Sequence, residues 1–227
     1  MNLTVTSLLL VKNAFKTSLE MLEERGFDTS SVDQGDESVE KLFENRKMLW
    51  KMLHKDDKDR ECFLYMEDPT INFKSENFIS VMKKIEAVKA EELLTDAILI
   101  FNNPKPTFLE KKITQINKRT EKIITLELDQ PKLKIQSFNY LEQQFNKTKH
   151  ELVPRHIRLE KEQREKVIEK YLGKDGDPNL FPGILDTDPI ARWLWLVPGD
   201  IVMIIRKSET CGTYVCFRHC ITKDQIS

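Results

Sequence analysis

The segment that decides the fold is PGDIVMIIRKSETCGTYVCFR, residues 198–218. Its apolar run, Ile201–Ile205, is bounded by a Pro-Gly-Asp turn and by polar residues, which is the pattern of a buried strand. Residues Thr213–Arg218 alternate between β-branched, aromatic and polar side chains and predict a second strand. The Ser-Glu-Thr-Cys-Gly between them supplies polar residues and a glycine that can adopt positive φ, so we expect a β-hairpin.

Two helices are predicted ahead of this hairpin. Asp188 and Pro189 form a helix start, because Asp can cap free N–H groups and Pro is tolerated at the first helical position. A short helix should follow over Ile190–Trp195, and a longer one is predicted over Glu160–Tyr171. The sequence therefore predicts a small C-terminal mixed β module with short helices.

The preceding part of the chain predicts an α/β domain. An amphipathic helix over Leu3–Arg25 should stop at Gly26, and a second helix is expected over Val39–Leu53. Strands and helices then alternate: strand Cys62–Met66, helix Phe78–Val88, strand Ala97–Phe101, a helix from Thr107, and strand Ile123–Leu128. Helical crossovers imply a partly parallel sheet flanked by helices. The fold class is α+β or α/β, with domains at residues 1–147 and 148–227.

Composition narrows the function classes. The chain has 227 residues, of which 40% are hydrophobic and 32% charged, and its formal net charge is −1. A freestanding DNA-binding protein usually has a large basic excess, so any DNA contact should be local and weak. No apolar run approaches the ~18 residues that span a bilayer, so no membrane partner is expected.

The sequence carries no motif that indicates catalysis or cofactor binding. There is no Walker loop, dinucleotide-binding fingerprint or nucleophile elbow, so we expect no cofactor. Cys216, His219 and Cys220 invite a metal interpretation, but four strand residues separate the two thiols by ~13 Å. Two thiolates at ~2.3 Å from one zinc cannot lie that far apart, which favours structural cysteines and no metal.

Three linked motifs carry a family resemblance. HELVPRHIRL (residues 150–159) is followed by DPIAR (188–192) and by IIRKSETCGTY (204–214), in that order. This series resembles the shared fifth subunit of eukaryotic-type DNA-directed RNA polymerases, and the C-terminal module alone resembles the H-type subunit of archaeal RNA polymerase. The run FKTSLEMLEERGFD (residues 15–28) resembles the opening helix of the same family.

The resemblance implies a non-catalytic subunit, located in the nucleus, or in a viral factory or virion if the gene is viral. Its C-terminal module would dock on the largest polymerase subunit, contact other small subunits and support assembly. Its N-terminal domain would form part of the lower jaw around downstream duplex DNA. The implied subunit-interface residues are His156, Asp188, Pro189, Arg192, Arg206, Ser208, Glu209, Thr210, Gly212, Tyr214 and Arg218.

A lysine-containing loop is the candidate DNA contact. In the family, a proline-containing loop after the Ala97–Phe101 strand faces downstream DNA, and Pro106 and Thr107 fall on that position. A proline-stiffened backbone, a helix N-terminus and nearby lysines can meet phosphates without reading sequence. The candidate DNA-binding residues are Lys105, Pro106, Thr107, Lys111 and Lys112. An ordinary surface loop is the alternative.

The chain also departs from the family pattern. The family usually has aromatic-x-Gly-Leu-Lys-Arg-Gly after its Ala-Arg, where this chain has Trp193-Leu-Trp195-Leu-Val-Pro198-Gly199. An arginine is also replaced at Gly183 and another at Thr213. Such losses suggest a divergent host, a paralogue serving a specialised polymerase, or a virus-encoded copy.

Two other function classes stay open. Glu127 and Asp129 follow the last predicted strand of the N-terminal domain and invite a metal-dependent nuclease, although two carboxylates are few for a hydrolytic magnesium site. A regulator that borrows the docking module is the other alternative.

Overall fold

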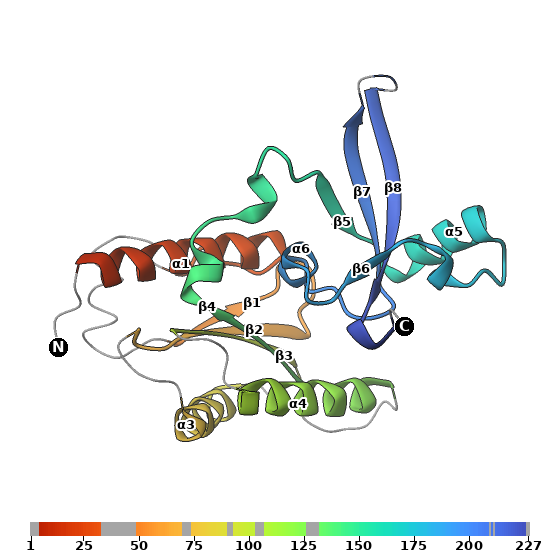
Figure 1. The fold of residues 1–227 in the computed structure, drawn as a ribbon. Helices are drawn as coiled ribbons and strands as arrows, with labels where there is room; N and C mark the ends of the chain where they lie inside the picture. The colour runs from red at the N-terminus through yellow and green to blue at the C-terminus, as the bar shows by residue number, and fades with distance from the viewer. Residues whose placement is uncertain are drawn as a thin grey trace. The chain divides into compact units, whose positions relative to one another are not determined.

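The computed structural model describes residues 5–32, 49–69, 74–89, 93–102, 107–125, 132–208, 210 and 212–225. The chain divides into two compact units, residues 1–145 and 146–227, each with its own mixed sheet (Figure 1). The predicted α+β fold class is confirmed; that the two parts fold independently, with a boundary at residue 147, stays a proposal. Within the described residues, none of the helices has the length and apolar character needed to cross a membrane.

The first unit is a four-stranded sheet between two layers of helices. Its strands, in spatial order, are β1 (Leu49–Leu53), β2 (Arg60–Met66), β3 (Leu94–Phe101) and β4 (Leu133–Asn139). β1 pairs antiparallel with β2, whereas β2, β3 and β4 are parallel, as helical crossovers require. Helix α1 (Val5–Glu24) covers one face, and α3 (Ser75–Glu86) and α4 (Thr107–Thr125) cover the other (Figure 1). A short 3-10 helix, η1 (Tyr140–Gln143), follows β4.

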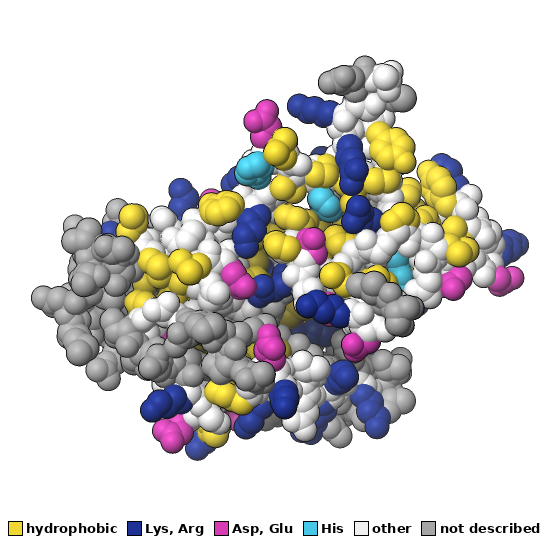
Figure 2. All heavy atoms as spheres, viewed as in Figure 1, with side chains coloured by type: hydrophobic (Ala, Val, Ile, Leu, Met, Phe, Trp, Pro, Cys, Tyr) yellow, Lys and Arg dark blue, Asp and Glu magenta, His cyan; other side chains and the backbone are white. Residues whose placement is uncertain are grey.

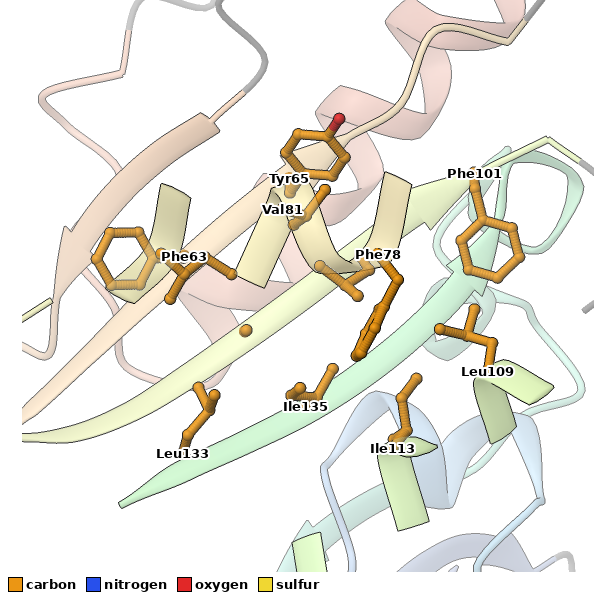
Figure 3. Packing of buried hydrophobic residues seen from close by; sticks show 12 residues of the cluster. Phe63, Tyr65, Phe78, Val81, Phe101, Leu109, Ile113, Leu133 and Ile135 are labelled. Carbon is orange, nitrogen blue, oxygen red and sulfur yellow. The ribbon is translucent and has the colours of Figure 1, made fainter. Parts of the chain in front are cut away.

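The core of this unit lies between the sheet and the pair α3 and α4 (Figure 3). The helices contribute residues at helical spacing, and the strands contribute alternate residues because successive strand side chains point to opposite faces. The buried members are Phe63, Tyr65, Phe78, Val81, Ile85, Ala97, Leu99, Phe101, Leu109, Ile113, Leu133 and Ile135.

Helix α1 ends in a Schellman motif, as its sequence predicts. The Gly26 N–H donates to the Glu23 carbonyl at 2.9 Å and the Phe27 N–H to the Leu22 carbonyl at 3.0 Å. Gly26 adopts φ +91°, and a Cβ there would lie 2.5 Å from the imidazole Nε2 of His54. Glycine is thus required both by the backbone conformation and by the close approach of a side chain.

Two predicted elements of this unit are wrong over the residues that the structure describes; residues 39–48 of the predicted helix and 126–128 of the predicted strand lie outside them. Leu49–Leu53 was expected to end a helix but forms β1, because pairing with β2 decides the conformation of these five residues. Residues 123–125 were expected to begin a strand but complete α4, and the last strand is β4. Asn117 of α4 explains the arrangement: its side chain exchanges two hydrogen bonds, at 2.8 and 2.9 Å, with the main chain of Ile135.

The second unit contains a sheet in the order β5-β7-β8-β6. Its strands are β5 (Arg155–Arg158), β6 (Gly183–Leu185), β7 (Ile201–Ser208) and β8 (Gly212–Ile221). Its helices are η2 (Lys147–Lys149), α5 (Lys161–Leu172), η3 (Pro178–Leu180), α6 (Pro189–Trp193) and η4 (Lys223–Gln225). The predicted hairpin is β7–β8, antiparallel and continuous from the Ile201–His219 pair to the Ser208–Gly212 pair.

Helix α6 ends two residues earlier than predicted, at Trp193, because the chain turns there through a second Schellman motif. The Trp195 N–H donates to the Arg192 carbonyl at 3.2 Å and the Leu196 N–H to the Ala191 carbonyl at 2.8 Å. Trp195 occupies the left-handed position of this motif, with φ +53°, where the resemblance predicts glycine. Its side chain is buried, so packing holds a residue type that the backbone conformation disfavours.

Candidate functional site

Most of the predicted interface residues lie on the β7–β8 hairpin, and the strand register brings them to one face. In antiparallel strands, directly paired residues share a face, and the register pairs Arg206 with Tyr214 and Val202 with Arg218. His156 of β5 pairs with Ile204 and joins the same set. The predicted residues on this face are His156, Arg206, Ser208, Tyr214 and Arg218. We call it the motif face.

The outer part of the motif face is exposed, whereas its base is covered by the unit's own core. Arg206 is exposed, and Tyr214 has an exposed fraction of 55%. At the base, Val202, Ile204 and Cys220 pack with residues of α6 and the loop that follows it. Figure 1 shows the two long strands extending beyond β5 and β6, so the outer part has no covering element among the described residues of this unit. The geometry suits a surface that contacts another molecule.

The hairpin turn is only partly described. Gly212 adopts φ +71°, a conformation that favours glycine, and the hydroxyls of Ser208 and Thr210 lie 3.2 Å apart. Glu209 lies outside the described residues. The expected turn glycine is therefore in place, and the interface role of the turn stays a prediction.

Asp188 and Pro189 have a structural role of their own. The Asp188 carboxylate accepts hydrogen bonds from the N–H of Ile190 at 2.8 Å and of Ala191 at 3.4 Å, and Pro189 is the first helical residue. The predicted helix start is confirmed. Arg192 is half-buried on the same helix. This motif thus fixes the local fold of α6, and an additional interface role for its residues remains to be tested.

His156 is held by its own loop. Its Nδ1 donates to the Pro154 carbonyl at 2.7 Å, and burial lowers the pKa of the imidazole. The ring is therefore anchored to its own segment, and an interface role for it stays a prediction.

The cysteines of β8 were candidate metal ligands in the sequence. Cys216 and Cys220 lie in the same strand, and burial raises the pKa of the Cys220 thiol to about 12. Burial also lowers the pKa of His219, which lies next to Cys220 in β8. Among the described residues there is no group of three metal-ligating side chains.

An ionic hub at the base of the hairpin was not found from the sequence. The Asp200 carboxylate lies 3.0 Å from Arg158 Nη2 and accepts a hydrogen bond from the Val197 N–H at 3.0 Å. Arg164 of α5 lies 3.9 Å from the same carboxylate and donates to the Gly199 carbonyl at 3.3 Å. The hub joins β5, α5 and the turn before β7, so it positions the hairpin. The Pro-Gly-Asp turn was the available signal, but its long-range partners were not predictable locally.

The predicted DNA-facing residues lie at the start of α4. Lys105 and Pro106 fall outside the described residues, and Thr107 is the first residue of the helix. Lys111 and Lys112 are exposed in the first two turns of α4. The structure thus brings these two lysines to the end of the helix that adjoins the candidate loop.

Hydrogen bonds connect the residues that directly follow the parallel strands. Asn102, directly after β3, donates from its side-chain amide to the Pro69 carbonyl at 2.6 Å. Glu67, directly after β2, accepts from the Tyr65 hydroxyl at 3.0 Å, and its main-chain carbonyl accepts from Tyr140 at 2.6 Å. Burial raises the pKa of the Glu67 carboxyl. These bonds make a defined platform at the carboxyl end of the parallel strands, where function commonly lies in such sheets.

The nuclease interpretation finds no support in the fold. Glu127 and Asp129 lie outside the described residues, and they do not follow the last strand, which is β4. The observation on which that interpretation depended is therefore corrected.

The C-terminal unit resembles known polymerase subunits in sequence. A model of the family described as RNA polymerase Rpb5, C-terminal domain, matches residues 145–220. The archaeal DNA-directed RNA polymerase subunit Rpo5 of Thermofilum pendens is 43% identical over 74 residues, which cover 33% of this chain and 89% of that protein. The chain belongs to the Rpb5 family.

Eukaryotic Rpb5 proteins match this chain along nearly its whole length. A DNA-directed RNA polymerases I, II and III subunit of Dictyostelium discoideum is 29% identical over 208 residues, covering 91% of this chain and 94% of that protein. The corresponding subunit of Caenorhabditis elegans is 28% identical over 215 residues, covering 89% and 92%. The archaeal Rpb5-type subunit thus matches a third of the chain, and the eukaryotic subunits match both units.

Proposed function

We propose that this Rpb5-family chain is a non-catalytic subunit of a multisubunit DNA-directed RNA polymerase. The observation that carries the proposal is the match to polymerase subunits over 91% of the chain and 94% of the relative. The convergence of His156, Arg206, Tyr214 and Arg218 on one face supports it, since none of this set is needed to complete the unit's apolar core. The location that follows is the nucleus, or a viral factory or virion if the gene is viral.

Within the polymerase, the C-terminal unit docks on the largest subunit and supports assembly. The motif face offers arginines, hydroxyl groups and an exposed tyrosine along the β7–β8 hairpin. Tyr and Arg are enriched at protein interfaces because they combine apolar area with directional hydrogen bonds.

The N-terminal unit forms part of the lower jaw and contacts downstream DNA. Support comes from Lys111 and Lys112, exposed at the end of α4 that adjoins the platform of Asn102 and Pro69. A chain with net charge −1 gains little long-range attraction to DNA, so the contact depends on docking, which keeps the jaw beside DNA already held by the enzyme.

Affinity purification of the tagged full chain from native extract tests the main proposal. The chain should elute in one-to-one ratio with the two large polymerase subunits, and an Arg206→Glu/Arg218→Glu variant should lose them. Recovery of the wild-type chain without either large subunit would contradict polymerase membership. Cleavage of labelled DNA or RNA by the purified chain with magnesium would contradict the non-catalytic role.

The DNA contact is tested by Lys111→Ala/Lys112→Ala in the assembled polymerase. Assembly should be unchanged, crosslinks from the jaw to downstream DNA should fall, and the salt dependence of DNA retention should weaken by roughly one to two units of slope, about one per lost phosphate contact. Lys118→Ala/Lys122→Ala is the matched control, because these lysines are exposed on the same helix but farther from its N-terminus. Equal effects of the two double variants would refute the assignment.

A further inference from the structure

The outer edge of β8 is open along most of its length. β8 runs from Gly212 to Ile221, but its neighbour β6 pairs only with His219–Ile221. Among the described residues, no strand lies beside the remaining edge, Thr213–Arg218. Figure 1 shows this part of the hairpin extending past β6.

Hydrogen bonds at the base of β8 show which main-chain groups face this edge. The Cys220 N–H donates to the Asp200 carbonyl at 2.8 Å and the Cys220 carbonyl accepts from the Gly199 N–H at 3.0 Å, so even-numbered residues face β7. The His219 N–H donates to the Pro182 carbonyl at 3.0 Å, on the side of β6. Because the direction alternates along an antiparallel strand, the N–H and C=O groups of Thr213, Val215 and Phe217 point to the open edge.

This edge lacks the features that usually prevent strand pairing. Natural edge strands are short, charged, bulged or covered. Residues 213–217 contain no charged residue and no proline, Arg218 stands only at the inner end of the edge, and the pairing with β7 is continuous without a bulge. Val215 is 43% exposed. The first unit provides the contrast: its edge strand β4 is covered by Asn117 of α4, which bonds the main chain of Ile135.

The side chains around the edge define what would bind there. The described residues of β7 and β8 include Arg206, Lys207 and Arg218 but no Asp or Glu. Hydrophobic and basic side chains lie next to one another along the hairpin (Figure 2). The ring of Phe217 already lies 5.3 Å from that of Tyr171 and 6.0 Å from that of Phe181. An added strand would therefore place one set of alternate side chains against Val215 and the other set beside Tyr214 and Arg218.

We propose that the open edge of β8 accepts an extended segment of another polymerase chain as an added strand, in which apolar residues alternate with acidic ones. The proposal rests on the proposed function, and the edge adjoins the motif face, so one partner could use both. Main-chain hydrogen bonds to Thr213 and Val215 would supply affinity, and Arg218 would select acidic side chains. A second copy of this chain is disfavoured, because pairing two β8 edges brings together two basic hairpins.

Val215→Pro tests the added strand. Proline removes an N–H that faces the open edge and obstructs an incoming strand, but it leaves the β7–β8 hydrogen bonds intact. Its matched control is Val215→Thr, which retains the N–H and the β-branched shape. In the tagged full chain, Val215→Pro should reduce recovery of the large polymerase subunits about tenfold relative to Val215→Thr.

Amide hydrogen exchange separates the possible outcomes. On assembly of the wild-type chain, the amides of Thr213, Val215 and Phe217 should become protected, and free Val215→Pro should keep wild-type protection of the even-numbered β8 amides. If the wild-type chain does not recover polymerase, the proposed function itself fails. If wild type and Val215→Pro assemble equally, or the edge amides stay unprotected, only the added strand is refuted. A dimer of the free chain that Val215→Pro abolishes would replace the proposed partner by a second copy.

Discussion

Replacement of Trp195 by glycine and by alanine measures two opposing effects at the end of α6. Trp195 is 7% exposed and adopts φ +53° at the position where α1 has Gly26 in the same hydrogen-bonded motif. The left-handed conformation costs a residue with a Cβ about 1–2 kcal/mol, which glycine avoids. Truncation of a buried tryptophan costs about 3–5 kcal/mol, so the loss of burial is the larger effect.

These magnitudes predict an order of stability in which tryptophan is best, glycine second and alanine last. The free energy of unfolding of the Trp195→Gly variant should be about 3 kcal/mol below that of the wild type. Glycine removes the cost of the left-handed backbone, but this offsets only part of the stabilisation lost with the buried indole. Glycine should still exceed alanine by about 0.5–1 kcal/mol, after its greater freedom in the unfolded chain is subtracted. For a unit of this size, the melting temperature of the glycine variant should fall by roughly 12–24 °C.

Thermal unfolding of the full chain should be followed by far-UV circular dichroism, with amide exchange of β7 and β8 to report on the second unit alone. Tryptophan fluorescence is unsuitable because the substitution removes one of the probes. Two results would refute the reasoning. Alanine more stable than glycine would mean that the left-handed conformation costs less than the extra freedom of glycine in the unfolded chain. Glycine as stable as tryptophan would mean that burial of the indole contributes no more than the left-handed backbone costs.

Two further predictions concern capping and burial. Asp188→Ala should destabilise the second unit by about 1 kcal/mol in denaturant unfolding, whereas Asp188→Asn, which retains an acceptor for the Ile190 N–H, should cost much less; equal losses would contradict the capping role. Burial raises the pKa of the Glu67 carboxyl in the folded state above its pKa in the unfolded chain. The protonated carboxyl therefore stabilises the fold at low pH, and this stabilisation should be lost as the pH rises from the unfolded-state pKa through the folded-state pKa. Glu67→Gln should remove this part of the pH dependence of unfolding, and an unchanged slope would count against it.

Local signals in the sequence were sufficient to predict the helices whose first or last turn contains a capping or terminating residue. Apolar residues at helical spacing and Gly26 predicted α1, and the Asp188-Pro189 pair predicted the start of α6. The apolar run of β7 and the polar turn after it predicted the hairpin. Each of these features acts through bonds or spacing within a few residues, so a single segment contains the information.

Tertiary contacts decided the elements whose local pattern was ambiguous. Leu49–Leu53 forms a strand because β2 offers it a pairing edge, and β4 lies where Asn117 of α4 can bond its main chain. The same holds for the candidate site. The spacing of motif residues in the sequence does not show that they share one face, because strand pairing sets that register.

The conformation of Trp195 is the clearest case in which tertiary contacts, and not local sequence, decide the structure. By itself, the sequence showed only that a tryptophan stands where the family pattern has a glycine. Only the fold buries the indole, and the free energy of that burial exceeds the cost of a left-handed backbone, so a residue with poor local propensity can hold the turn. Burial depends on which distant segments surround a side chain, and that information exists only once the chain has folded.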